Sequence, residues 1–130
     1  MPSVTQRAFI RLLVVAGSLV LAGCRDARPA ELPGKYVITT DWGQSTLTLR
    51  PDHTMEQEVS KRSGPTMHIS GSWEFSNGFL SLKPCLEVRW NIEGAAAGGC
   101  ASGVEVTLFG KVEISADSDH GLAYEKMKER

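Results

Sequence analysis

The stretch Met67-His-Ile-Ser-Gly-Ser-Trp-Glu-Phe75 decides the fold, because its side chains alternate between apolar and polar with a period of two. One parity holds Met67, Ile69, Trp73 and Phe75, and the other holds His68, Ser70, Ser72 and Glu74. This two-sided alternation is typical of an antiparallel strand with one face in solvent. We therefore predict a half-buried strand with Trp73 inside and His68 outside.

The same alternation continues on both sides of this stretch and predicts about eight strands. They cover residues 35–40, 45–50, 55–61, 66–75, 79–83, 86–92, 104–115 and 122–127. Short turn signals separate them, of which Asn77-Gly78 is the strongest because a type I′ turn needs positive φ at both central residues. The segment 104–115 is predicted to be one long strand, since its parity survives across Gly110. The longer segment 94–103 is rich in glycine and alanine and is predicted to be a flexible loop.

These elements predict an all-β fold, an antiparallel meander of about eight strands that forms an up-and-down barrel or a strongly curled sheet, because closure hides strand edges. Gly71 and Gly110 are expected to let two strands bend. Five aromatic residues are expected to face inward and to fill most of the barrel: Tyr36, Trp73, Phe75, Trp90 and Tyr124. Trp42 and Phe79 are expected at a rim or contact surface.

Short motifs across this region carry a family resemblance. They are Gly34-x-Tyr36, Ser45-Thr-Leu-Thr-Leu-Arg-Pro-Asp52, Gly71-Ser-Trp-Glu74, Leu80-Ser-Leu82 and Tyr124-Glu-Lys126. Their order resembles the small lipocalin-like domains of bacterial envelope lipoproteins. His53 stands where those domains usually have the glycine of an Asp-Gly turn. The resemblance implies a barrel over residues 34–130 that holds a small apolar ligand, although many such domains have no known ligand.

The N-terminus has the pattern of an export signal. Arg7 and Arg11 precede an uncharged run from Leu12 to Ala22, about half the roughly 20 residues that a membrane span needs. The run ends in Leu21-Ala22-Gly23-Cys24, which resembles the lipobox of bacterial lipoproteins. The resemblance implies a signal peptide over residues 1–23 and lipid chains on Cys24. A plain secretory signal or a buried core helix remains an alternative.

Residues 24–33 are polar, contain two prolines and are predicted to be a lipidated N-terminus with a short extended tether. In the lipoprotein family an aspartate directly after the cysteine often signals retention in the inner membrane. Arg25 occupies that position here, so we expect the outer membrane, with the domain facing the periplasm.

With Cys24 lipidated, Cys85 and Cys100 are left, an even number in an oxidising compartment. We predict a disulfide between them that closes a loop of about 15 residues. Two separate free cysteines are the alternative. Zinc is less favoured, because no Cys-x-x-Cys pair or closely spaced histidine pair accompanies them.

Several chemistries find little support in the sequence. The formal net charge is -1 and no basic run occurs, which argues against a nucleic-acid partner. No Gly-x-Ser-x-Gly elbow is present, and His53, His68 and His120 are expected to be solvated. The carboxylate pairs Glu56 with Glu58 and Asp117 with Asp119 are expected to be surface charge. Copper held by His53 and Met55, or by Met67 and His68, is less favoured than core packing of both methionines.

The sequence thus favours a membrane-anchored envelope lipoprotein that is not an enzyme and needs no cofactor or metal. Its barrel is expected to bind a small apolar ligand or an envelope protein. The alternative is a structural or accessory lipoprotein with a filled barrel.

Overall fold

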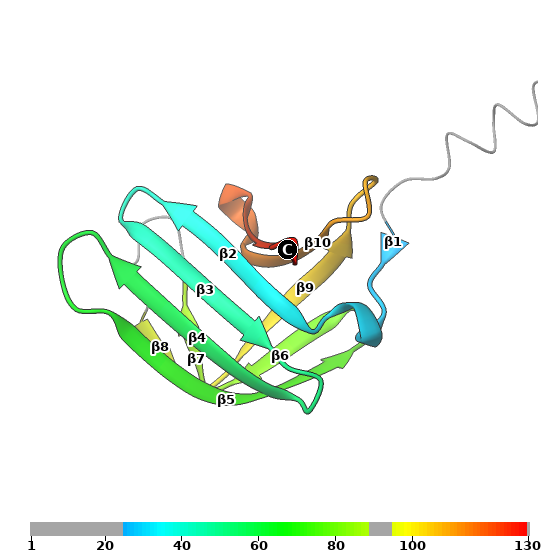
Figure 1. The fold of residues 1–130 in the computed structure, drawn as a ribbon, viewed down its shortest axis with the longest axis horizontal. Coiled ribbons are helices and arrows are strands. Elements are labelled where there is room, and N and C mark those ends of the chain that lie inside the picture. The colour runs from blue at the N-terminus through cyan, green and yellow to red at the C-terminus, as the bar shows by residue number, and fades with distance from the viewer. Residues whose placement is uncertain (1–24, 89–94, 130) are drawn as a thin grey trace, which may run out of the picture.

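A computed structural model describes residues 25–88 and 95–129, and within them the fold is all-β (Figure 1). The strands are β1 (Arg25–Asp26), β2 (Gly34–Thr40), β3 (Gly43–Leu49), β4 (Thr54–Lys61), β5 (Met67–Ser76), β6 (Phe79–Lys83), β7 (Cys85–Glu87), β8 (Ala95–Ala97), β9 (Cys100–Val106), β10 (Val112–Asp117) and β11 (Leu122–Lys126). Two single-turn 3₁₀ helices, η1 (Pro29–Glu31) and η2 (Ser118–His120), complete the described elements. Cys24 and Trp90 lie outside the described residues.

Eight of these strands close into an antiparallel barrel, as predicted. The order β9-β10-β11-β2-β3-β4-β5-β6 is closed by pairing of β6 with β9. Closure gives each of these eight strands a neighbour on both sides, and each wall strand turns alternate side chains into one shared core.

The predicted faces of β5 are confirmed. Trp73 is 2% exposed and donates from Nε1 to the carbonyl of Arg50 at 2.9 Å, whereas His68 is exposed. Tyr36 and Tyr124 are buried as expected, and Phe75 is half-buried against the core. The alternation of apolar and polar residues over 67–75 therefore matches the observed pairing register of β5.

The prediction of one long strand over 104–115 is wrong. The chain reverses there, because Thr107 donates to Lys111 O at 2.8 Å and Gly110 adopts a φ of 77° in the turn. Val106 pairs with Val112 across the resulting hairpin of β9 and β10. Opposite residues of an antiparallel pair face the same side of the sheet, so the two apolar patterns stay in phase and imitate one strand. Gly110 serves the turn and does not bend a strand.

The prediction of a wall strand over 86–92 is also wrong for its described part. β7 leaves the wall and pairs with β8, inside the predicted loop 94–103, in a separate two-stranded sheet. Gly71 makes room for this departure, since a Cβ on it would lie 2.2 Å from the carbonyl oxygen of Lys83. Gly71 belongs to the inward parity of β5, so the chain crosses the inner face there. Cys85, Leu86 and Val88 are consequently buried.

Residues 25–33 pack against the barrel instead of forming an extended tether. β1 pairs with β9, and Ala27 and Leu32 are buried at 7% and 0% exposure. Tyr36 fixes this segment by donating from its hydroxyl to Leu32 O at 2.6 Å. Residues 25–33 contain too few apolar side chains to show a periodic pattern in the sequence. Leu32 nevertheless closes this end of the barrel.

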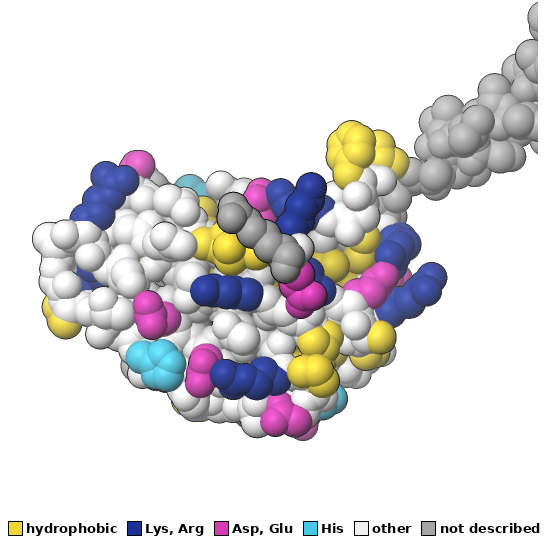
Figure 2. Space-filling view, in the orientation of Figure 1, with side chains coloured by type: hydrophobic (Ala, Val, Ile, Leu, Met, Phe, Trp, Pro, Cys, Tyr) yellow, Lys and Arg dark blue, Asp and Glu magenta, His cyan; other side chains and the backbone are white. Residues whose placement is uncertain are grey.

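The barrel has two different ends, named here by what closes them. At the N-terminal end lie η1, β1 and the turns 50–53, 77–78 and 107–111. At the disulfide end lie the turn 41–42, the segment 62–66, η2 and the entries to β7 and β9. Figure 2 shows hydrophobic side chains exposed on the tip of the hairpin of β9 and β10, at the N-terminal end.

Candidate functional site

The predicted disulfide is present and joins Cys85 to Cys100, with Cα atoms 5.9 Å apart. It ties the first residue of β7 to the first residue of β9. Cys85 is 1% exposed, so the bond lies in the core of the disulfide end. The disulfide therefore holds β7, which leaves the barrel wall after β6, against β9 of that wall.

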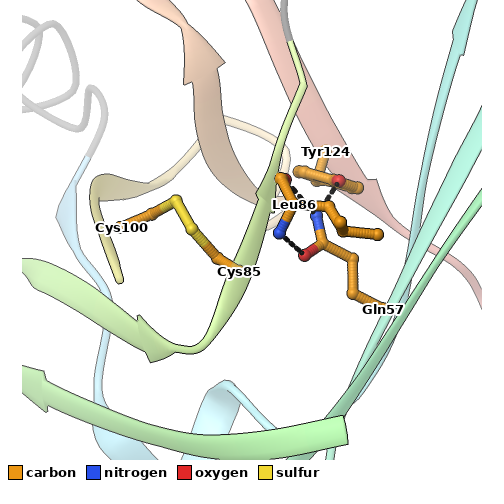
Figure 3. Close-up of a disulfide and its surroundings, with 5 residues drawn as sticks. All are labelled: Gln57, Cys85, Leu86, Cys100 and Tyr124. Atoms are coloured by element: carbon orange, nitrogen blue, oxygen red, sulfur yellow. Dashed lines mark hydrogen bonds between the residues drawn. A yellow bond between two sulfur atoms is a disulfide. The ribbon is translucent and has the colours of Figure 1, made fainter. Parts of the chain in front are cut away.

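Gln57 holds the same segment from the opposite wall (Figure 3). Its side-chain amide donates to Leu86 O and accepts from Leu86 N–H, both at 2.7 Å. Within the described residues, β7 pairs through its backbone with β8 alone, and the side chain of Gln57 bonds its other edge. Since Gln57 is 2% exposed, both of its amide atoms are satisfied inside the barrel, as buried polar groups require.

A chain of buried polar groups continues from Gln57. Its Nε2 also donates to the Tyr124 hydroxyl at 3.0 Å, and that hydroxyl lies 2.6 Å from Ser45 Oγ. Burial raises the pKa of Tyr124, while the hydrogen bonds with Ser45 and Gln57 work in the opposite direction. Tyr124 therefore presents a neutral phenol to the interior. Among the described residues, no buried side-chain nitrogen or oxygen lacks a partner.

A cavity of about 320 Å³ lies beside this polar chain. Its apolar walls are Leu47, Leu82, Leu86 and Ile114, and Gln57 and Tyr124 supply the polar side. A volume near the lower limit of known ligand pockets, combining apolar walls with a few fixed polar groups, suits a small molecule. This cavity is the candidate functional site.

The cavity lies behind the seam between β9 and β10, where the barrel wall is incompletely paired. Pairing of the two strands ends at Val104 with Ile114, although β9 begins at Cys100 and β10 continues to Asp117. The register of β10 against β11 shifts between Ser115 and Asp117, which marks a bulge that bends β10. Small residues line both the cavity and an outer groove of about 630 Å³: Ala101, Ser102, Ser115 and Ala116. One layer of small side chains thus separates the cavity from the outer surface.

The sequence analysis did not single out Gln57 or Ser45 for this site. A usable signal was present, because Gln57 shares the inward parity of Met55 and Val59, and Ser45 shares that of Leu47 and Leu49. A polar residue at an inward position is either an error of register or a specific interior partner. The cavity itself depends on the path of β7, which the pattern of residues 86–92 did not reveal.

The residues considered for other chemistry lie apart from this cavity. His53 stacks on Trp73 with ring centroids 4.3 Å apart, His68 is exposed, and His120 Nδ1 lies 3.1 Å from the carboxylate of Asp117. Glu56 forms an exposed ion pair with Arg50 at 2.9 Å, next to the exposed Glu58. Glu56 and Glu58 thus lie in β4, Asp117 ends β10 and Asp119 lies in η2.

The methionines of the copper alternative belong to the packing of the barrel. Met55 is 1% exposed and Met67 is half-buried against the core. Within residues 25–88 and 95–129, no three His, Cys, Asp or Glu side chains are grouped so that they could hold a metal ion. In the same ranges, no helix has the length and apolar character to cross a bilayer.

The two aromatic residues expected at a surface differ. Phe79 is 57% exposed at the start of β6, whereas Trp42 is half-buried and packs against the core at the turn between β2 and β3.

Comparison with protein-family models, curated proteins and solved structures finds no match for this chain. The site must therefore be interpreted from its own geometry.

Proposed function

We propose that this protein is a lipid-anchored envelope lipoprotein whose lipocalin-like barrel binds a small, mainly apolar ligand. The lipobox-like Leu21-Ala22-Gly23-Cys24 supports the anchor, and the disulfide is in keeping with an oxidising compartment. Arg25 after the cysteine supports the outer membrane, with the domain in the periplasm. The protein acts as a binding module and not as an enzyme.

The observation that carries the ligand proposal is the cavity behind the seam of β9 and β10. Four aliphatic side chains would contact the body of a ligand, and Ser102 and Ser115 line the same cavity. The ligand that fits is a compact apolar molecule with one hydroxyl or carbonyl group at the seam. Its size is limited by the space of about 320 Å³.

The ligand proposal is tested with N-phenylnaphthylamine, a fluorescent apolar probe, added to the purified mature protein. We expect saturable binding that Ser102→Phe abolishes, because a phenyl ring at the seam would occupy the entry. Ser70→Phe is the matched control, since Ser70 is exposed on the outer face of β5. Loss of binding in both variants, or no binding by the unmodified protein, would favour the alternative of a structural lipoprotein with a filled barrel.

The anchor is tested separately by growing cells with a labelled fatty acid. The protein should carry the label, and Cys24→Ser should not, because the acyl chains need the cysteine thiol and its new amino group. The mass of the mature protein gives an independent readout. A mature N-terminus without acyl mass would exclude the anchor and leave the ligand proposal untouched.

A further inference from the structure

The two ends of the barrel differ in exposed hydrophobic surface. Four large hydrophobic side chains are strongly exposed among the described residues, and all four lie at the N-terminal end: Phe79 at 57%, Leu108 at 61%, Phe109 at 94% and Met127 at 46%. Leu108 and Phe109 are the corner residues of the hairpin turn between β9 and β10, which Figure 2 shows projecting from the body of the protein. A projecting apolar corner of this kind marks a contact with a membrane or a protein.

The chain path favours the membrane. Arg25 pairs with Val106, two residues before Leu108, so the chain starts its packed course beside the projecting turn (Figure 1). Cys24 is covalently next to Arg25, and consecutive Cα atoms are about 3.8 Å apart. Because residues 25–33 are packed and supply no slack, lipid chains on Cys24 would hold this end of the barrel at the bilayer surface.

The polar residues around the turn suit a membrane surface as well. A groove of about 710 Å³ beside the turn is lined by Phe109 and Met127 together with Lys111, Lys126 and Lys128. Lysine side chains pack their methylenes on apolar surface and keep their ammonium groups at its polar rim. Lys111 reaches Glu125 at 2.7 Å and Lys126 donates to Glu31 O at 2.6 Å, so both are held at the rim of the groove.

We infer that the turn carrying Leu108 and Phe109 inserts into the same leaflet as the acyl chains of Cys24 and fixes the barrel with its N-terminal end on the bilayer. This inference rests on the proposed lipid anchor. It directs the disulfide end, with the ligand cavity, away from the membrane. The occupant of the apolar surface is therefore a phospholipid bilayer, and a partner protein is the competing outcome.

The experiment uses the purified mature protein reconstituted in vesicles of phosphatidylethanolamine and phosphatidylglycerol with brominated acyl chains, which quench nearby tryptophan. Phe109→Trp should lose most of its added emission compared with vesicles without bromine, after the signal of the unsubstituted protein is subtracted. Ser63→Trp is the matched control, because Ser63 is exposed at the disulfide end. Its added emission should be unchanged.

The mass of the same samples separates this inference from the anchor. Acylated protein in which Phe109→Trp is not quenched would overturn membrane contact at the turn and favour a protein partner there. Equal quenching of both variants would overturn the fixed orientation. Selective quenching of Phe109→Trp in a sample without acyl mass would exclude the anchor and still support contact of the turn with lipid.

Discussion

The two ends of the barrel are closed in the same way, but the side chains around the two closing segments differ. At the N-terminal end, Leu32 fills the opening and its carbonyl accepts a hydrogen bond from Tyr36. At the disulfide end, Leu86 fills the opening and both of its backbone polar groups bind Gln57. In each case a buried wall side chain satisfies the backbone of a segment that lies outside the wall.

The difference lies in what surrounds each closing segment. The N-terminal segment lies at the end that carries the exposed apolar side chains, whereas the disulfide-end segment borders a cavity with a buried polar chain and a weakly paired seam. Under the proposed function, this contrast places membrane attachment at one end of the barrel and ligand binding at the other.

The largest effect is expected at the core between the two ends. Trp73→Ala should lower the free energy of unfolding by about 3 to 5 kcal/mol, because it removes a buried ring. The exposed control on the same strand, His68→Ala, should change it by no more than about 0.5 kcal/mol. Urea denaturation of both variants measures the difference, and equal small effects would show that β5 is not half-buried.

The second largest loss of stability is expected when the disulfide between Cys85 and Cys100 is removed. Replacing both Cys85 and Cys100 by alanine should lower the free energy of unfolding by about 3 kcal/mol, because the crosslink closes a loop with a sequence separation of 15. Thiol titration of the unfolded, unreduced mature protein should find neither cysteine reactive. Two reactive thiols would contradict the disulfide and remove the covalent difference between the ends.

A smaller loss is expected when the hydrogen-bonded tie is removed. Gln57→Leu keeps the side-chain bulk but leaves Leu86 N–H and C=O without partners, which should cost about 2 kcal/mol and loosen β7. Tyr36→Phe is the corresponding change at the N-terminal end and should cost about 1 kcal/mol, since it leaves one carbonyl unpaired. Amide hydrogen exchange should quicken at Leu86 in the first variant only. Unchanged exchange there would mean that Gln57 does not hold the segment.

The smallest effect is a pH dependence confined to the N-terminal end. The side chain of Arg25 and the backbone N–H of Arg28, at 2.9 Å, stabilise the Glu31 carboxylate and lower its pKa from 4.5 to about 2. Because the folded pKa lies below the unfolded one, this stabilisation is present above about pH 4.5. It is lost as the pH falls through about 2. NMR titration of the Glu31 carboxyl carbon measures it, with Glu31→Gln as the control for other groups, and an ordinary pKa would contradict the contact.

The sequence predicted the parts of the fold that depend on local alternation. Side-chain parity placed Trp73, Tyr36 and Tyr124 inside and His68 outside, and all four assignments are confirmed. The even number of remaining cysteines led to the disulfide, which is also confirmed. The burial of these side chains could be predicted because it follows from alternation with a period of two. The disulfide could be predicted because two cysteines remain beside Cys24.

The features that could not be predicted depend on where the chain goes between elements. Residues 104–115 keep one parity whether or not the chain reverses at Gly110, so the alternation could not distinguish one strand from a hairpin. β7 has the apolar content of a wall strand but crosses the interior past Gly71. The two errors offset each other, so the count of eight wall strands is right although one member is different. The cavity was missed because its position follows from that crossing.

Binding of a small apolar molecule in the cavity at the disulfide end can be followed by NMR of the mature protein with N-phenylnaphthylamine. If the ligand enters this cavity, the Gln57 side-chain amide and the backbone amides of Ala101, Ser102 and Ala116 should show saturable shifts. Leu32 and Tyr36, at the N-terminal end, should not shift. Shifts confined to the N-terminal end, or none at saturating probe, would contradict the claim.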